Sequence, residues 1–186
     1  MNKLDAKPVL VILDRDGVIN ADPKGYISTP EEWQAFPGSL EAIARLNALR
    51  IRVAVASNQS GVARGFFDKA ALERVTQRME ADLAAVGGRL DFIAYCPHHP
   101  IDDCVCRKPK IGLLQQISRA LQISLNAHVW FVGDSERDIL AALAASCTPI
   151  LVKTGNGAAT LAHEALEKCP VFEDLAAVVH YIDGLS

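Results

Sequence analysis

The chain has 186 residues, half of them hydrophobic and 22% charged, which suits one compact α/β domain with a sizeable core and excludes a second full domain. Its formal charge of −3 provides no bulk basic surface, so we expect a small substrate and neither nucleic acid nor a membrane as partner. No basic-then-apolar leader opens the chain, and no apolar run approaches the roughly 18 residues of a membrane helix, so we expect a cytoplasmic protein.

Five apolar runs predict the strands of a parallel sheet. They are continuous rather than alternating, as expected for strands covered on both faces. Helical patterns fall between them, and this alternation predicts an α/β fold, a single doubly wound parallel sheet with helices on both faces. The strands are expected at residues 9–13, 53–56, 92–95, 129–132 and 150–152, and the helices at 39–49, 68–86, 111–122, 136–145 and 158–168.

Two local signals predict where helices begin. The run Thr29-Pro30-Glu31-Glu32 has the pattern of a capping box with proline at the first helical position, and Asp68 can cap the long helix after it. Residues 21–37 are too few to fold as a separate cap domain. We therefore expect one domain over residues 1–186, whose site is covered by loops alone.

Ligands of open parallel sheets bind beyond the carboxyl ends of the strands, and four of the predicted ends carry polar residues that fit one reaction. Asp-Arg-Asp-Gly follows the first strand at 14–17, and Ser-Asn-Gln-Ser-Gly follows the second at 57–61. A cysteine loop that ends in Arg-Lys-Pro at 107–109 follows the third strand, and Gly-Asp-Ser-Glu-Arg-Asp occupies 133–138 after the fourth.

These side chains fit the hydrolysis of a phosphate ester. Asp14 and Asp134 would present hard oxygen ligands to magnesium on neighbouring strand ends. The cation would offset the repulsion between carboxylate and phosphate, so that Asp14 could attack phosphorus and form an aspartyl-phosphate. Asp16 could protonate the leaving oxygen and then deprotonate water. Ser57 and Lys108 would bind the equatorial phosphoryl oxygens.

Each of these groups alone also has a structural explanation. An Asp-x-Asp run is usually a solvated turn, Ser57 and Asn58 could end a strand in a turn, and Lys108 could be an ordinary surface lysine. Ser135 could be a helix N-cap with Asp138 completing the box. Because four strand ends each carry the residue type that one mechanism requires, the joint pattern favours the catalytic interpretation.

The run Asp-Arg-Asp-Gly-Val at 14–18 resembles the first motif of the haloacid dehalogenase superfamily of phosphatases. Ser57 is similar to the Ser/Thr of its second motif, Lys108 to the lysine of its third, and Gly133-Asp134 with Asp138 to the acidic fourth. The resemblance spans residues 9 to about 155. It implies that Asp14 is the nucleophile, that Asp16 is the general acid/base, and that the backbone carbonyl of Asp16 is a further magnesium ligand.

The loop after the third predicted strand holds three thiols and an imidazole, a set that suits tetrahedral zinc in a structural site. The alternatives are His99 as a competing ligand and a free-thiol loop with buried cysteines, because the spacing is not that of a common zinc finger. Arg107 and Lys108 directly follow the last ligand, so a clamped loop would hold two cations over the phosphate site. The predicted zinc ligands are Cys96, His98, Cys104 and Cys106.

Within the superfamily, the zinc loop and the missing cap resemble the histidinol-phosphate and heptose-bisphosphate phosphatase group. The runs at 14–20, 25–26 and 58–65 resemble the heptose-bisphosphate phosphatases. They imply a monomer that hydrolyses the 7-phosphate of D-glycero-D-manno-heptose 1,7-bisphosphate to heptose 1-phosphate, on the way to nucleotide-activated heptose and the lipopolysaccharide core. Only five residues separate His98 from Cys104, a short loop like that of histidinol phosphatases, so histidinol phosphate remains the alternative substrate.

A bisphosphate needs cationic or amide donors outside the magnesium site, and Arg107 is placed for a bidentate grip. By resemblance, residues 22–26, 57–60 and 107–108 would form the substrate surface, while Lys24 and Arg64 could also be simply solvated. The substrate-binding candidates are Asp22, Lys24, Gly25, Tyr26, Asn58, Gln59, Ser60, Arg64 and Arg107.

Three other classes of function fit less well. A phosphate-binding module without turnover predicts the loss of a carboxylate, yet Asp14, Asp16 and Asp134 are all present. A nucleic-acid end-processing phosphatase predicts a basic track, which the acidic balance of the chain disfavours. A structural zinc module that serves as an interaction platform would leave the carboxylates without a purpose.

Overall fold

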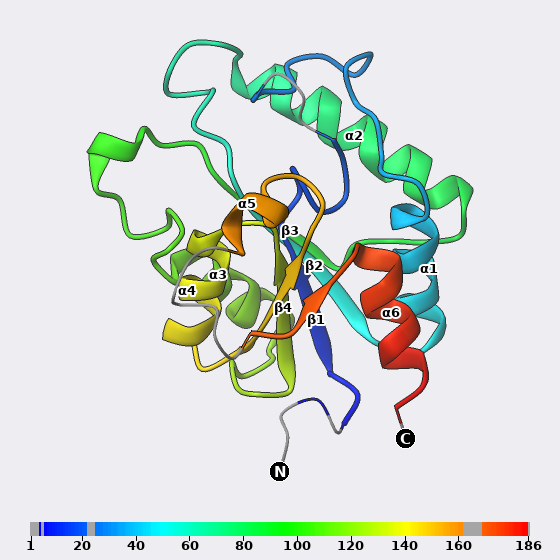
Figure 1. Cartoon of the computed structure of the whole chain (residues 1–186). Helices are drawn as coiled ribbons and strands as arrows, with labels where there is room; N and C mark the ends of the chain where they lie inside the picture. The colour runs from blue at the N-terminus through cyan, green and yellow to red at the C-terminus, as the bar shows by residue number, and fades with distance from the viewer. Residues whose placement is uncertain (1–3, 5, 22–24, 162–168, 186) are drawn as a thin grey trace.

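The computed structural model describes residues 4, 6–21, 25–161 and 169–185. Its six strands form one parallel sheet in the order β3-β2-β1-β4-β5-β6 (Figure 1). The strands are β1 (Leu10–Leu13), β2 (Arg52–Asn58), β3 (Phe92–Cys96), β4 (Val129–Gly133), β5 (Thr148–Val152) and β6 (Val171–Phe172). The helices are α1 (Ser39–Ala48), α2 (Lys69–Ala85), the 3₁₀ helix η1 (Pro100–Asp102), α3 (Gly112–Leu121), α4 (Glu136–Ala144), α5 (Gly157–Thr160) and α6 (Leu175–Asp183).

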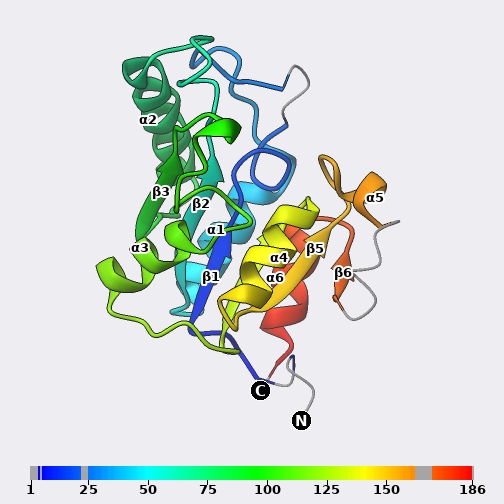
Figure 2. The same cartoon turned by 90° about the vertical axis from the view of Figure 1, so that its left-hand side faces the viewer.

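Helices cover both faces of the sheet, as the alternating pattern predicted. Figures 1 and 2 show α1, α2 and α6 over one face and α3 and α4 over the other. Successive side chains of a strand point to opposite faces, so Val11 of β1 packs with the first group of helices and Ile12 with the second. Both β1 faces are therefore buried in apolar layers, which accounts for its continuous run of apolar residues.

The five predicted strands and the five predicted helices are present, and four of those helices agree to within two residues at each end. The fifth, expected at 158–168, is described only as the short α5, because residues 162–168 lie outside the described part. Strand β6 and helix α6 were not predicted from the sequence. Asp68 caps α2 as predicted, its side chain accepting a hydrogen bond from the Ala71 backbone amide.

The predicted helix start at Thr29 was wrong. Residues 29–32 form a turn, closed by a hydrogen bond from the Glu32 backbone amide to the Thr29 carbonyl. The Glu32 carboxylate accepts hydrogen bonds from the backbone and hydroxyl of Ser28 instead. Its side chain thus closes a loop, and the segment continues toward α1 without forming a helix.

The sheet has a switch point between its two central strands. From β1 the chain proceeds to β2 on one side, while β4 pairs with β1 on the other side. Connections therefore leave the carboxyl ends of β1 and β4 in opposite directions and open a crevice there, which is where open α/β sheets bind ligands. In the part of the chain that the structure describes, no helix combines the length and the apolar character needed to cross a membrane.

Candidate active site

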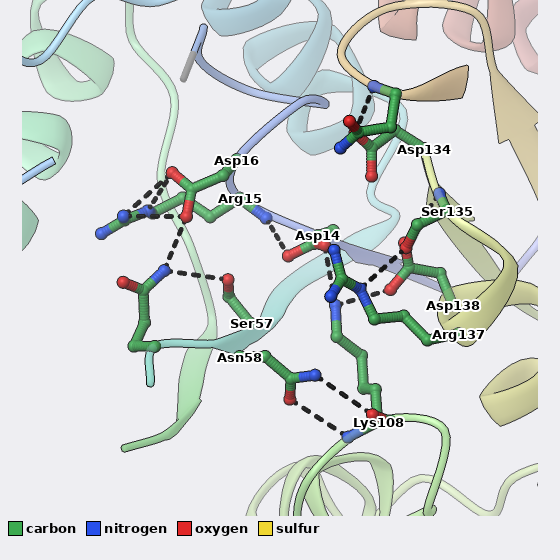
Figure 3. A network of polar contacts seen from close by, with 12 residues as sticks. Asp14, Arg15, Asp16, Ser57, Asn58, Lys108, Asp134, Ser135, Arg137 and Asp138 are labelled. Carbon is green, nitrogen blue, oxygen red and sulfur yellow. Dashed lines mark hydrogen bonds and ion pairs between the residues drawn. The ribbon is translucent and has the colours of Figure 1, made fainter. Parts of the chain in front are cut away.

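The crevice contains a cavity of about 390 Å³. Asp14 enters it directly after β1, Ser57 and Asn58 enter it from the end of β2, and Asp134 enters it directly after β4 (Figure 3). The structure thus brings together the residues that the sequence analysis expected at three neighbouring strand ends. The described lining residues are Asp14, Asp16, Gly17, Ala21, Phe36, Ser57, Asn58, Asp134, Arg137, Gly155 and Asn156.

Lys108 lies at the base of this site and is fully buried. Its Nζ is 2.8 Å from Oδ2 of Asp14 and 2.7 Å from Oδ1 of Asp138. Burial alone would lower the pKa of Lys108, but the charges of Asp138 and Asp14 outweigh that effect and raise it. The lysine is therefore a fixed cation beside Asp14, and the surface-lysine alternative does not apply.

Asp138 holds Lys108 through the start of α4. Its Oδ2 accepts a hydrogen bond of 3.1 Å from the Ser135 backbone amide and one of 2.5 Å from the Ser135 hydroxyl. The capping box that the sequence suggested at Ser135 and Asp138 therefore forms. The two interpretations of this motif are compatible, because Asp138 caps the helix with one oxygen and pairs with Lys108 through the other.

Carboxylates at the site outnumber the nearby positive charges. Oxygens of Asp14, Asp134 and Asp138 lie within 4.8 Å of one another. Burial raises the pKa of Asp14 despite the opposing charge of Lys108. Burial and the neighbouring Asp14 raise the pKa of Asp134 to about 7. A buried group of hard oxygens short of positive charge is the donor set that a divalent cation such as Mg²⁺ fits.

Asp134 is oriented by the loop after β5. Its Oδ2 accepts a hydrogen bond of 2.8 Å from the Asn156 backbone amide and one of 3.1 Å from Asn156 Nδ2. Gly17 has φ +88°, and a Cβ built there would lie 2.0 Å from Asp134 Oδ2. Only glycine therefore allows the backbone after Asp16 to approach this carboxylate so closely.

Four hydrogen bonds surround the Asp16 carboxylate. Arg15 donates from Nε and Nη2 at 3.0 Å each, Asn20 Nδ2 donates at 2.9 Å and Gln59 Nε2 at 2.7 Å. Burial alone would raise the pKa of Asp16, but the Arg15 charge and these hydrogen bonds outweigh it and hold that pKa below its usual value. Gln59 also donates to Ser57 Oγ at 3.1 Å, so one side chain links two predicted catalytic groups.

Asn58 connects β2 to the loop that carries Lys108. Its Nδ2 donates to the Lys108 carbonyl at 3.2 Å, and its Oδ1 accepts from the Lys108 backbone amide at 3.1 Å. Asn58 and Gln59 were both expected to bind substrate. Asn58 lines the cavity, but its side-chain amide hydrogen-bonds to the Lys108 backbone. The side-chain amide of the buried Gln59 donates hydrogen bonds to Asp16 and Ser57. The observed contacts of both side chains position other site residues.

The remaining substrate-binding candidates do not line the described cavity. Tyr26 packs against Phe66 in a tilted arrangement with ring centroids 4.8 Å apart, and Arg107 lines a separate hollow beside Cys104 and Lys110. Gly25 and Arg64 are exposed, and Ser60 is buried. Asp22 and Lys24 lie outside the described residues.

The predicted metal ligands of the cysteine loop converge. Cys96 Sγ lies 3.3 Å from Cys106 Sγ and 3.6 Å from Cys104 Sγ, and His98 Nδ1 lies 3.2 Å from Cys106 Sγ. Tetrahedral zinc with bonds of about 2.0–2.3 Å needs ligand atoms separated by roughly 3.3–3.8 Å. The four residues therefore fit the ion. His99 is not part of this converging group, and its Nδ1 accepts a hydrogen bond from the Ile101 backbone amide at the start of η1.

Sequence reasoning missed three residues of the site. Arg15 is fully buried and grips Asp16, Asn156 holds Asp134, and Arg137 lines the cavity. Arg15 lies in the run 14–17 and Arg137 in the run 133–138, both of which the sequence marked as catalytic motifs. Their positions beside catalytic candidates could therefore have identified them as site residues. Asn156 follows β5, and a search of every strand end would have included it.

Known proteins are similar to this chain over most of its length. The family model described as HAD-hydrolase-like matches residues 105–178. The D-glycero-beta-D-manno-heptose-1,7-bisphosphate 7-phosphatase of Pseudomonas aeruginosa is 52% identical over 169 residues, which cover 91% of this chain and 94% of that protein. The protein of the same name from Neisseria meningitidis serogroup A is 40% identical and covers 93% of this chain, with 94% of its own length matched.

A solved structure matches across the same span. The crystal structure of D,D-heptose 1,7-bisphosphate phosphatase from B. bronchiseptica, complexed with magnesium and phosphate, has a TM-score of 0.88 and 50% sequence identity. The match covers 92% of this chain and 96% of that one. Identity at this level over nearly the whole length shows a common family. The chain belongs to the haloacid dehalogenase-like hydrolases, in the family of the D-glycero-D-manno-heptose 1,7-bisphosphate 7-phosphatases.

Proposed function

We propose that the protein is a magnesium-dependent phosphatase that removes the 7-phosphate of D-glycero-beta-D-manno-heptose 1,7-bisphosphate and leaves heptose 1-phosphate. The observation that carries the proposal is the meeting of Asp14, Ser57, Lys108 and Asp134 at one end of the sheet. The names of relatives that are 40% and 52% identical supply the substrate and its beta anomer. The relative solved with magnesium and phosphate supports the cation.

Asp14 and Asp134, with the backbone carbonyl of Asp16, would hold the magnesium ion. Both carboxylates line the cavity, whereas Asp138 is fully buried, is not among the described lining residues and already pairs with Lys108. When bound, the cation would offset the repulsion between the Asp14 carboxylate and the phosphate. Asn156 would keep Asp134 turned toward the ion through its two hydrogen bonds.

Asp14 would act as the nucleophile. Its carboxylate attacks phosphorus, the bond between phosphorus and the sugar oxygen breaks, and an aspartyl-phosphate forms. Lys108 Nζ, 2.8 Å from Asp14 Oδ2, and the Ser57 hydroxyl would bind the phosphoryl oxygens, where charge is stabilised during an in-line transfer. Lys108 needs no rearrangement for this role, since Asp138 and Asn58 already hold it in place.

Asp16 would transfer the protons. Because the pKa of Asp16 is held below its usual value, the acid is the minor protonated form, which takes its proton from solvent. That form gives the proton to the departing sugar oxygen, and the resulting carboxylate then takes a proton from the water that attacks the aspartyl-phosphate. That second step releases inorganic phosphate and restores Asp14. Arg15, Asn20 and Gln59 orient the carboxyl group through the hydrogen bonds around it.

We also propose that zinc occupies the cluster of Cys96, His98, Cys104 and Cys106 as a structural ion. The compact arrangement of the four ligand atoms supports this assignment. Lys108 follows the last ligand by two residues, so the ion would fix the loop that delivers this cation to Asp14. We further propose that a single domain without a cap carries the activity and that the protein works as a monomer.

Histidinol phosphate is the second candidate substrate. The observation that favours it is the short interval of five residues between His98 and Cys104. The names of the relatives favour the heptose bisphosphate instead.

A comparison of specificity constants separates the two candidates. Magnesium-dependent phosphate release is measured with both anomers of D-glycero-D-manno-heptose 1,7-bisphosphate and with histidinol phosphate. We expect the beta anomer to exceed histidinol phosphate by at least about a hundredfold in kcat/KM, or about 2.7 kcal/mol of transition-state discrimination. A preference for histidinol phosphate would reject the heptose assignment while leaving the Asp14 mechanism intact.

A further inference from the structure

Arg137 differs from every other described residue that lines the catalytic cavity, because it is the only one with a positive charge. The sequence predicted that Arg107 binds a second phosphate. The structure places Arg107 in the lining of a separate hollow of about 220 Å³, beside Cys104 and Lys110. Lys108 pairs with Asp14 and is assigned to the reacting phosphate, so among the described lining residues the cation left for a second phosphate is Arg137.

The Arg137 guanidinium is held by a hydrogen bond at Nε, which does not use its two Nη groups. Its Nε donates a hydrogen bond of 3.1 Å to Ser135 Oγ, and Ser135 is itself fixed by Asp138 (Figure 3). This contact orients the plane of the guanidinium and uses Nε, so that the two Nη groups remain available to an acceptor in the cavity. Two parallel N–H groups on a fixed plane match the oxygens of a phosphate.

The position of Arg137 in the helix also calls for an anionic ligand. Arg137 is the second residue of α4, after the N-cap Ser135. A positive charge in the first turn of a helix is opposed by the helix dipole, whereas an anion at the same place is stabilised. A phosphate bound between the start of α4 and the guanidinium would interact favourably with the helix dipole and would also offset the positive charge of Arg137.

We propose that Arg137 binds the phosphate of the substrate that is not cleaved. The inference rests on the proposed function, since only a bisphosphate has such a group. The reacting phosphate would lie at the buried end of the cavity, where the exposed fractions of Asp14 and Ser57 are 5% and 2%. Arg137 lines the same cavity but is exposed to solvent. It therefore lies toward the mouth, where the part of the substrate farthest from Asp14 must lie.

The test compares ligands that carry one phosphate or the other. Wild type and Arg137→Ala are assayed with heptose 1,7-bisphosphate and with heptose 7-phosphate, which has only the cleaved group. Heptose 1-phosphate and inorganic phosphate serve as competitive inhibitors, because the first carries the uncleaved group and the second mimics the cleaved one. We expect kcat/KM for the bisphosphate to fall about ten- to a hundredfold, the size of a lost charge-assisted contact.

The pattern across the ligands decides the outcome. The inhibition constant of heptose 1-phosphate should rise by the same factor, and the losses with heptose 7-phosphate and inorganic phosphate should be at least tenfold smaller. Arg137→Lys should recover part of the loss, since it keeps the charge without the bidentate geometry. Arg119→Ala removes an exposed arginine of α3 that is not among the described lining residues, and serves as the matched control.

Equal losses with both substrates, or none with the bisphosphate, would overturn the assignment of Arg137. A wild-type protein with no preference for the bisphosphate over heptose 7-phosphate would instead overturn the proposed substrate. The two failures are therefore distinguishable in one set of measurements.

Discussion

Replacing Lys108 with methionine should destabilise the fold as well as stop phosphate release. Methionine keeps most of the buried stem, but it removes the Nζ that lies 2.8 Å from Asp14 and 2.7 Å from Asp138. Two nearly inaccessible carboxylates then face each other without the cation between them. Breaking a buried ion pair in this way costs about 3–5 kcal/mol.

Thermal unfolding in magnesium-free buffer measures this cost. A domain of this size loses about 2–4 °C of Tm per kcal/mol, so we expect the midpoint to fall by roughly 6–20 °C. The double variant Lys108→Met with Asp138→Asn should regain part of that loss, because the asparagine removes one of the two uncompensated charges. Recovery in a double variant identifies the cause as charge rather than lost packing.

Lys110→Met provides the control for this experiment. Lys110 pairs with Asp103 on the surface, where the two side chains are 45% and 90% exposed, so the change should stay within about 0.5 kcal/mol of wild type. The reasoning would be refuted by a Lys108→Met protein within about 1 kcal/mol of wild type. A double variant with the full sum of the two single losses would also refute it.

Three further predictions concern the metal sites. Asn156→Ala removes the 3.1 Å hydrogen bond from Nδ2 to Asp134, so Mg²⁺ should bind about tenfold more weakly in a calorimetric titration. Unchanged affinity would contradict the role assigned to Asn156. Gly17→Ala places a Cβ against the Asp134 carboxylate, on a backbone with φ +88°, so magnesium-dependent activity should fall at least about a hundredfold in a folded protein. Activity near that of wild type would show that the loop can move away. Removing zinc with a selective chelator in excess magnesium should lower kcat at least about tenfold, because the loop that carries Lys108 loses its clamp, and re-addition of zinc should restore it. Unchanged kcat after verified zinc loss would separate the cysteine cluster from catalysis.

The sequence predicted the parts of this molecule that follow from strand and helix periodicity. Buried parallel strands need continuous apolar runs, so β1 and β4 could be located, and their carboxyl ends placed Asp14 and Asp134 at one crevice. The α6 helix was also readable in principle, because Leu175, Val178 and Ile182 repeat at helical spacing after Asp174, whose side chain caps the helix. Strand β6 has only two residues, too few for any periodic signal.

Side-chain direction accounts for most of what the sequence could not supply. Asn58 and Gln59 stand beside Ser57 in the chain, yet both turn their amides to other protein groups. No spacing rule distinguishes an amide that meets a ligand from one that holds a neighbouring loop. The sequence favoured Arg107 as the cation for a second phosphate, whereas the folded chain places Arg137 among the described residues that line the cavity and Arg107 in a separate hollow.

The role of Asp14 as nucleophile is the central claim, and one substitution tests it directly. Magnesium-dependent phosphate release from D-glycero-beta-D-manno-heptose 1,7-bisphosphate is measured for wild type and for Asp14→Asn, with circular dichroism to establish that both are folded. We predict at least about a thousandfold lower kcat for the variant, since an amide cannot form the aspartyl-phosphate. Phosphate release by folded Asp14→Asn within about tenfold of wild type would contradict the mechanism.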